Sequence, residues 1–310
     1  MPSDAVPSGG GAGAGGQASR GSGPRLAVAR QLGALYAAQG AVHAVLCTGS
    51  TGRGDADRWS DLELGVVWET APTEAQRRQA IAATEGQGAQ LWPWDAGERL
   101  WADAWWHGAP PGQGLLVEVS HTTGAELEDR LAALQRGDPD PLLLSLGDAL
   151  TTGVALAGPE RVAAWRSRIT PYPRPLAAAV VRHHGQIDHF WRWQMYVERG
   201  NLLQLQLHFG DVATRLVHVA CALSGVWWPG PKRLLQTATR LPLGPEGLAD
   251  RLRRVPHQAP QAAAATLTAL VEESYDLVAR HLPEIDAERL RAIFRFARRP
   301  WPPATWADGA

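Results

Sequence analysis

Apolar and polar positions follow no pattern over residues 1–24, and helical spacing begins directly after them. Residues 1–24 are dominated by Gly, Ala and Ser, so they carry too little apolar surface to offset the entropy lost on ordering, and we expect a disordered tail. Over 25–39 the apolar residues recur at helical spacing, which predicts the first helix of a folded unit. They are Leu26, Ala29, Leu32, Leu35 and Tyr36.

Short apolar runs and helical segments then alternate as far as residue 137. Interleaving of this kind is typical of a sheet flanked by helices. Strands are expected over 41–48, 61–68, 89–92 and 114–120, and helices over 74–84 and 125–134, with a helix start at 51–54. The pattern therefore predicts an α/β domain over 25–138.

Helical spacing dominates after residue 138, and Gly or Pro marks most of the joins. Helices are predicted over 142–150, 160–168, 176–197, 202–223, 232–239, 261–282 and 287–297. Only 153–157 hints at extended structure. We therefore expect an α+β protein in which the α/β domain is followed by an all-helical domain over 139–310.

The composition of the chain limits both the kind of protein and the classes of binding partner to be expected. The length of 310 residues favours two domains, and 45% hydrophobic with 20% charged residues fits a globular protein with a real core. A formal net charge of -1 gives no global reason to expect binding to nucleic acid or to a membrane, and no apolar run approaches the roughly 20 residues that span a bilayer. Cys47 and Cys221 form neither a disulfide framework nor a zinc site, so a cytoplasmic location is expected.

The segment 49–68 carries the candidate chemistry. Gly49 and Ser50 end a strand and lead into a helix start, where free backbone N–H groups are suited to phosphate. Gly49 lets the backbone approach a ligand closely, and the hydroxyl of Ser50 can donate to a phosphate oxygen. Arg53 follows, placed either to contact a phosphate or to cap the helix surface.

Two acids lie on the next predicted strand. Asp61 and Glu63 are two positions apart, so their side chains share one face while Leu62 and Leu64 enter the core. Neighbouring carboxylates repel each other unless they share a cation, and an oxygen-rich site of this kind suits magnesium. A third carboxylate would complete a site for two ions about 4 Å apart.

Glu118 is the preferred third carboxylate. It is the charged residue within an apolar strand of sequence LLVEVS, where a charge is costly unless it has a partner such as a metal. Asp95, Glu98 and Asp103 are the alternatives, in turn-like or tryptophan-rich sequence.

These residues together resemble the signature of the DNA polymerase β-like nucleotidyltransferase superfamily, in which a Gly-Ser turn precedes an acidic–apolar–acidic strand and a later third acid. The matching residues are Gly49–Ser50, Asp61–Leu62–Glu63 and Glu118, and the segment from the first to the last of them is about 70 residues long. Arg53–Gly54 and Trp59–Ser60 are similar to a branch that includes the antibiotic (aminoglycoside-type) nucleotidyltransferases. The turn at 228–232 is similar to the C-terminal region of such proteins. Many members carry Asp where this chain has Glu63, and the family admits both.

The resemblance implies a mixed sheet with flanking helices and a magnesium-dependent transfer of a nucleoside monophosphate, AMP from ATP being the first expectation. Asp61, Glu63 and Glu118 would be the catalytic ligands of two magnesium ions. Gly49, Ser50, Arg53 and Lys232 would bind the triphosphate. Lys232 is the chain's only lysine, and a solvated helix start is the alternative interpretation of it.

The acceptor is left open by the sequence. A small molecule such as an aminoglycoside-like antibiotic fits a cleft between two domains. The alternatives are a protein hydroxyl, as in antitoxin-type nucleotidyltransferases that AMPylate a partner toxin, and a non-catalytic nucleotide-binding module. A nucleic-acid end is disfavoured because no dense basic stripe with interleaved aromatics is present. A homodimer is compatible with this interpretation.

Overall fold

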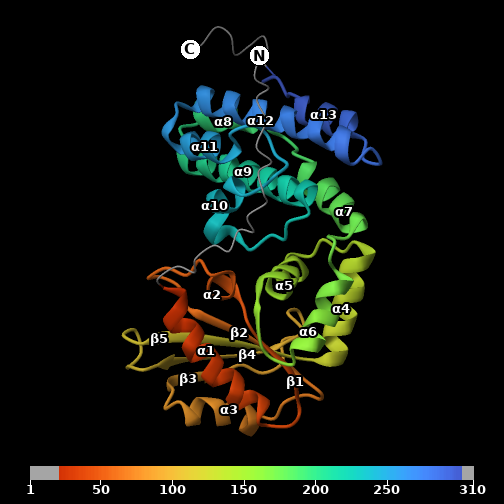
Figure 1. The fold of residues 1–310 in the computed structure, drawn as a ribbon. Coiled ribbons are helices and arrows are strands. Elements are labelled where there is room, and N and C mark those ends of the chain that lie inside the picture. The colour runs from red at the N-terminus through yellow and green to blue at the C-terminus, as the bar shows by residue number, and fades with distance from the viewer. Residues whose placement is uncertain (1–20, 302–310) are drawn as a thin grey trace, which may run out of the picture.

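The computed structural model describes residues 21–301, in which an α/β part carries a stack of helices (Figure 1). The predicted tail over 1–24 lies mostly outside the described residues, but its last residues belong to helix α1 (Ser22–Ala37). Ser22 is buried, and its hydroxyl accepts a hydrogen bond of 3.1 Å from the backbone N–H of Ala56. This anchor explains why the helix begins earlier than its apolar spacing predicts.

A six-stranded mixed sheet with the order β3-β4-β5-β2-β1-β6 forms the centre of the α/β part. The central pair β2 and β5 is parallel, and the other neighbours are antiparallel. The strands are β1 (Val42–Cys47), β2 (Leu62–Trp68), β3 (Gln87–Leu91), β4 (Trp101–His107), β5 (Leu115–Thr123) and β6 (Val154–Ala157). The strands expected from the sequence are confirmed, and two elements of the sheet differ from expectation.

Strand β4 occupies a segment of turn-like or tryptophan-rich sequence in which no strand was expected. Its inner face alternates as a strand should, with Asp103 and Trp105 both buried. Asp103 interrupts the apolar alternation because it binds Arg77 and His121 inside the protein. The strand was therefore not predicted, because a buried polar cluster interrupts its apolar alternation.

Strand β6 shows that the sheet continues beyond the predicted boundary at residue 138. It pairs antiparallel with β1, and α5 (Pro141–Thr152) and α6 (Pro159–Arg168) lead the chain to and from that edge. The strand lies within 153–157, where the sequence hinted at extended structure, and it is the exception to the helices expected over 139–310. A strand of four residues is too short to show a clear alternating pattern, so its pairing with β1 was not expected.

Each face of the sheet packs against different helices, because successive side chains of a strand point to opposite sides. One face carries Val45 and Leu62 and packs against α1 and α3 (Glu74–Ala83). The other face carries Leu46 and Val67 and packs against α4 (Gly124–Arg136), α5 and α6. The apolar cluster on this second face continues without a break into the helical part.

The helical part is built around α9, which packs against α7 and α12. Its elements are α7 (Arg174–Gly185), α8 (Arg192–Glu198), α9 (Leu202–Ser224), η1 (Pro231–Arg233), α10 (Leu234–Thr239), α11 (Leu248–Arg254), η2 (Val255–His257), α12 (Pro260–His281) and α13 (Ala287–Arg295). The single helix predicted over 176–197 is interrupted after Gly185, whose carbonyl accepts a hydrogen bond from the Tyr275 hydroxyl. Within residues 21–301, none of the helices combines the length and the apolarity that a membrane span requires.

Candidate active site

The turn after β1 is shaped around one glycine. Helix α2 (Gly49–Arg53) begins two positions after the strand ends, and Gly49 has a φ of 58°. A β-carbon built on Gly49 would lie 1.6 Å from Oε2 of Glu63. Glycine is therefore required both for the backbone conformation and for the space that the neighbouring carboxylate fills.

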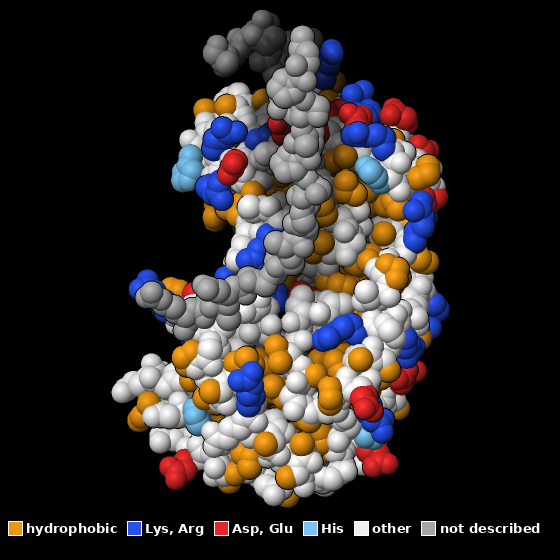
Figure 2. Space-filling model, viewed as in Figure 1, with side chains coloured by type: hydrophobic (Ala, Val, Ile, Leu, Met, Phe, Trp, Pro, Cys, Tyr) orange, Lys and Arg blue, Asp and Glu red, His pale blue; other side chains and the backbone are white. Residues whose placement is uncertain are grey.

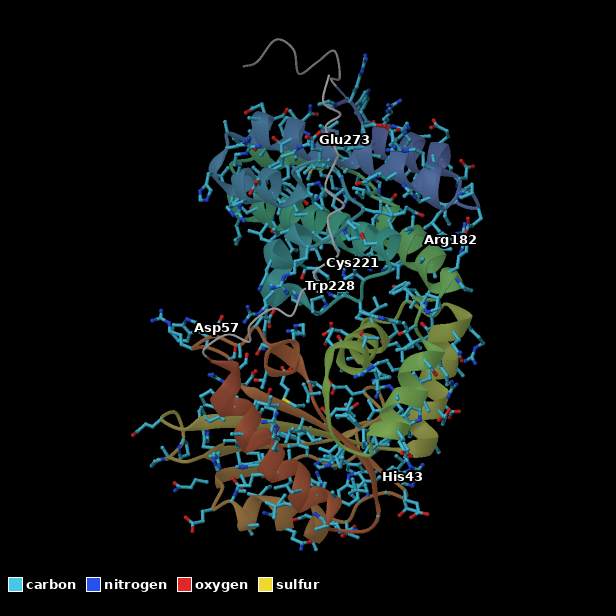
Figure 3. All side chains as sticks on the ribbon, viewed as in Figure 1. His43, Asp57, Arg182, Cys221, Trp228 and Glu273 are labelled. Carbon is cyan, nitrogen blue, oxygen red and sulfur yellow. The ribbon has the colours of Figure 1, made fainter. Side chains whose placement is uncertain are left out.

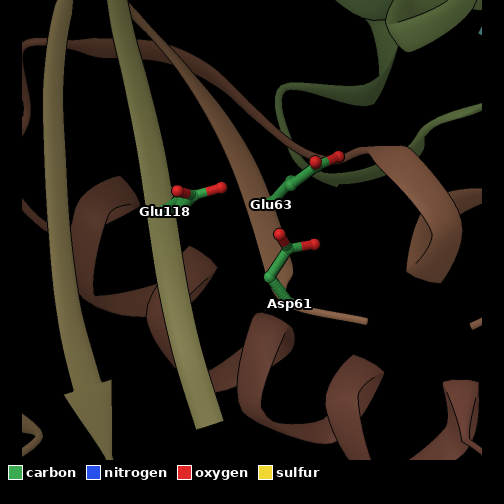
Figure 4. Close-up of side chains that lie close together, drawn as sticks. All are labelled: Asp61, Glu63 and Glu118. Carbon is green, nitrogen blue, oxygen red and sulfur yellow. The ribbon is translucent and has the colours of Figure 1, made fainter. Parts of the chain in front are cut away.

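Three carboxylates converge beside this turn (Figure 4). Glu63 on β2 and Glu118 on β5 are direct partners in the parallel ladder, and Asp61 lies immediately before β2. Oxygen atoms from the three side chains lie within 4.8 Å of one another. The structure thus brings together Asp61, Glu63 and Glu118, the three acids that the sequence analysis selected.

Glu118 occupies the expected place, but for a different reason than the sequence suggested. Strand β5 alternates, so that Val117 and Val119 are buried whereas Glu118 and Ser120 face outward. Glu118 is exposed, and it is therefore not a charge enclosed in apolar surroundings. Its face of the sheet is covered by α4 at one end and is open at the end where the carboxylates lie.

The electrostatics of the group favour a bound cation. Burial, followed by the charge of Asp61, raises the pKa of Glu63, and Lys232 partly opposes that rise. The neighbouring protein surface desolvates Glu118 in part, and this effect and the charge of Asp61 raise its pKa as well. Within the described residues these three acids are the group whose ligand atoms are close enough to hold a metal. Hard carboxylate oxygens and repelling negative charge fit a divalent cation such as Mg²⁺.

The alternative acids do not join this group. Asp103 is buried and bound to Nη1 of Arg77 at 2.5 Å and to Nε2 of His121 at 2.8 Å. Asp95 accepts hydrogen bonds from the backbone N–H groups of Gly97 and Glu98, and so it fixes its own loop. Glu98 reaches the cleft described below without approaching the three acids closely enough to share a metal.

A cleft of about 1080 Å³ lies over the carboxylates. Its floor is the open face of β2 and β5, and its walls are α2, α5 and the segment 229–236 of the helical part. Figure 2 shows the surface hollowed between the two parts. Figure 3 shows Asp57 on the rim formed by the α/β part and Trp228 on the side of the helical part.

Two predicted triphosphate ligands line this cleft and already have ionic partners. Nζ of Lys232 lies 3.7 Å from Oδ2 of Asp61, although 82% of the lysine side chain is exposed. Arg53 is engaged by Asp148 of α5. Lys232 therefore connects the helical part to the three carboxylates, and Arg53 is held in place at the wall of the cleft.

Two further ion pairs near the cleft were not predicted from the sequence. Nη2 of Arg233 lies 3.2 Å from Oδ2 of Asp57, and Nη1 of Arg240 lies 3.5 Å from Oδ2 of Asp55. Both join the helical part to the loop between α2 and β2. Such contacts depend on how distant elements pack, and no local sequence pattern predicts them.

Comparisons with known proteins add a distant structural similarity to this geometry. No family model matches the chain, and no curated protein matches it. A solved structure, a nucleotidyltransferase-like protein from Exiguobacterium sibiricum 255-15, is similar over 90% of this chain and 82% of its own, with a TM-score of 0.41 and 12% sequence identity. A likeness this distant does not assign the chain to a family.

Proposed function

We propose that the protein transfers a nucleoside monophosphate, AMP from ATP in the first instance, to a hydroxyl group of a small acceptor. The observation that carries the proposal is the convergence of Asp61, Glu63 and Glu118 beside the Gly49 turn, at the floor of a large cleft. Three carboxylates beside the Gly49 turn suit a metal-bound triphosphate better than an uncharged ligand.

The turn would hold the phosphates mainly through its backbone. Gly49, Ser50 and Thr51 begin α2, and their N–H groups have no backbone acceptor in the described part of the chain. A helix of five residues has only a small dipole, so these donors and the Ser50 hydroxyl would provide most of the attraction. Because Glu63 approaches Gly49 closely, a metal on this carboxylate would lie beside a phosphate bound at the turn.

Asp61, Glu63 and Glu118 are the residues that would hold magnesium. The bound cation would supply neutralisation of the charge that develops on the attacking and leaving oxygens. The carboxylates themselves are positioned by adjacent strands of one sheet, so little reorganisation is required when the substrate binds.

Lys232 would move from a carboxylate to the triphosphate. Its ammonium group faces Asp61 at 3.7 Å, and its long exposed side chain is free to swing toward a phosphate oxygen. Pyrophosphate would leave toward this lysine. Glu118, which is exposed and whose pKa is raised, is placed to accept the proton of the acceptor hydroxyl.

The lining of the cleft favours a small acceptor that carries amino groups. A volume of about 1080 Å³ leaves space beside a nucleotide, because single ligands usually occupy about 300–1,000 Å³. Glu98, which is not one of the proposed magnesium ligands, faces the cleft without an ion pair to another described residue. Such a carboxylate attracts a cationic acceptor, as in aminoglycoside-like compounds, and repels a nucleic-acid backbone. A protein hydroxyl is the second candidate acceptor.

Labelled ATP with magnesium tests the proposal when it is offered with separate pools of aminated small molecules, lysate proteins and RNA. Transfer should occur to the small-molecule pool, and Asp61→Asn and Glu63→Gln should abolish it. The matched control is Glu74→Gln, which removes an exposed carboxylate from α3. Magnesium should also raise the melting temperature of the unaltered protein but not that of Glu63→Gln. Full transfer by both folded variants would rule out the metal role.

A further inference from the structure

Trp59 is the one aromatic side chain among the described residues that line the cleft. The chain contains 14 tryptophans, yet this one stands at the mouth of the candidate active site with 81% of its surface exposed. Single exposed apolar residues are common on protein surfaces. Trp59 differs from such residues because hydrogen bonds and an ion pair hold the backbone of its loop in place.

The loop that carries Trp59 is closed by its own hydrogen bonds. The N–H of Trp59 donates to Oδ1 of Asp57 at 2.9 Å, and the N–H of Asp57 donates to the Ser60 hydroxyl at 2.9 Å. The Trp59 amide, ahead of the Ser60 hydroxyl, holds the pKa of Asp57 below its ordinary value. The carboxylate that closes the loop therefore stays charged.

Both parts of the protein hold this loop from outside. The guanidinium of Arg25 on α1 donates twice to the Ser60 carbonyl, at 3.0 and 2.8 Å, and Arg233 of the helical part binds Asp57. The indole itself contacts the Arg58 guanidinium, 4.8 Å from the ring centroid. A rigid base with a ring exposed above it is a surface on which a second ring can stack.

We propose that Trp59 is the platform on which the base of the nucleoside triphosphate stacks. This inference rests on the proposed function and identifies the residue that recognises the nucleoside. Trp59 lies two positions before Asp61, so their α-carbons are at most about 7 Å apart. The base of a nucleotide is joined through one ribose to the α-phosphate, so a triphosphate held at Asp61 and Gly49 brings its base within reach of the indole.

The base is the part of the substrates that this platform fits best. The backbone of the turn and the cation match the phosphates, and Glu98 matches an aminated acceptor. The base is flat and apolar on its faces, and the cleft offers it one aromatic ring. Stacking tolerates different bases, and the larger purines overlap an indole more extensively than pyrimidines do.

Calorimetric titration with Mg–ATP, Mg–CTP and Mg–tripolyphosphate tests the inference in the full-length protein and three variants. Trp59→Ala should weaken Mg–ATP binding by about tenfold, since stacking on an aromatic ring contributes on the order of 1–3 kcal/mol per base. Trp59→Phe should keep most of the affinity. Tripolyphosphate has no base, and its binding should be equal in all of them. Mg–CTP should lose less than Mg–ATP.

The matched control is Trp301→Ala, because Trp301 is 80% exposed and lies outside the cleft lining. Equal Mg–ATP affinity in Trp59→Ala and the unaltered protein would overturn the platform alone. A parallel loss of tripolyphosphate would overturn it too, because Trp59 would then only support the loop. If the unaltered protein bound neither ATP nor tripolyphosphate, the proposed function would fail together with this inference.

Discussion

Arg53 donates to Oδ2 of Asp148 at 2.7 Å and thereby ties the glycine turn to helix α5. Both side chains are largely buried, with 16% and 9% of their surfaces exposed. Burial raises the pKa of Asp148, and the charge and hydrogen bond of Arg53 act against that rise. The pair therefore anchors the candidate phosphate site to the first helix after the predicted domain boundary.

Removing the acid should destabilise the protein. Asp148→Ala leaves the Arg53 guanidinium largely buried with only the weaker contact to Asp55 at 3.7 Å, and we expect a loss of about 2 kcal/mol in the free energy of unfolding. Urea titration measures it. Arg53→Met should cost less when it is combined with Asp148→Ala than it does alone, and strictly additive losses would show that the two side chains do not interact.

Gly49→Ala should disable the site without unfolding the protein. The new methyl group would displace the Glu63 carboxylate, and a shift of about 1 Å in a reacting centre can lower the rate about 100-fold. The measurement is the rate of nucleotidyl transfer. Gly200→Ala is the control, because Gly200 also has a positive φ of 63° but open space where its β-carbon would lie. Similar losses of activity in both variants would attribute the effect to backbone strain instead.

Lys232→Met should reduce kcat/KM about 100-fold, as removal of a charged donor from a transition state does. Its effect on unfolding should stay within about 0.5 kcal/mol, because an exposed ion pair contributes little to stability. Arg240→Met provides the comparison: it also breaks an exposed ion pair to the same loop, but Arg240 does not line the cleft. Equal losses of activity would mean that the lysine acts only by holding the loop.

A stacked histidine pair in the helical part should make stability depend on pH. The rings of His184 and His218 lie 3.9 Å apart and nearly parallel, and burial lowers their pKa to about 3 and about 4. The charges of His183 and Arg215 contribute to both of these lowered values, and His218 contributes to that of His184 as well.

The unfolded chain takes up these protons near pH 6.5, so the stabilisation is present above that pH and is lost as the pH falls toward 4. We expect the free energy of unfolding to drop by up to roughly 3 kcal/mol for each ring between pH 7 and pH 4. His218→Gln should flatten this part of the profile, and the exposed His257→Gln should leave it unchanged. An unaltered slope in His218→Gln would contradict the assignment.

The candidate site was predictable because it depends on local rules. Side chains two apart on a strand share a face, so Asp61 and Glu63 had to point together, and a glycine before a serine marked the turn beside them. Glu118 was found although its exposure was misjudged, since an acid in an apolar strand is conspicuous whether it lies inside or outside. The alternation of burial along β5 was the better reason.

The remaining features depend on tertiary packing. Strand β4 was concealed because Asp103 faces inward and finds Arg77 there, a partner that lies on another element. Strand β6 was indicated only by a hint of extended structure at 153–157, because four residues show no clear alternation. The ion pairs from Arg233 and Arg240 join residues far apart in the chain. Trp59 was noticed only as part of a motif, because its exposure at the mouth of the cleft requires the whole fold.

The apolar cluster that runs from the second face of the sheet into the helices has a consequence for substrate entry. It joins residues as distant as Leu46 of β1 and Val271 of α12. Moving the helical part away from the sheet would separate this shared core and expose it to water. The free energy required would be far larger than that needed to move side chains. Under the proposed function, the two substrates would therefore enter a cleft whose width is set by this shared core, and that width would limit how large an acceptor can bind.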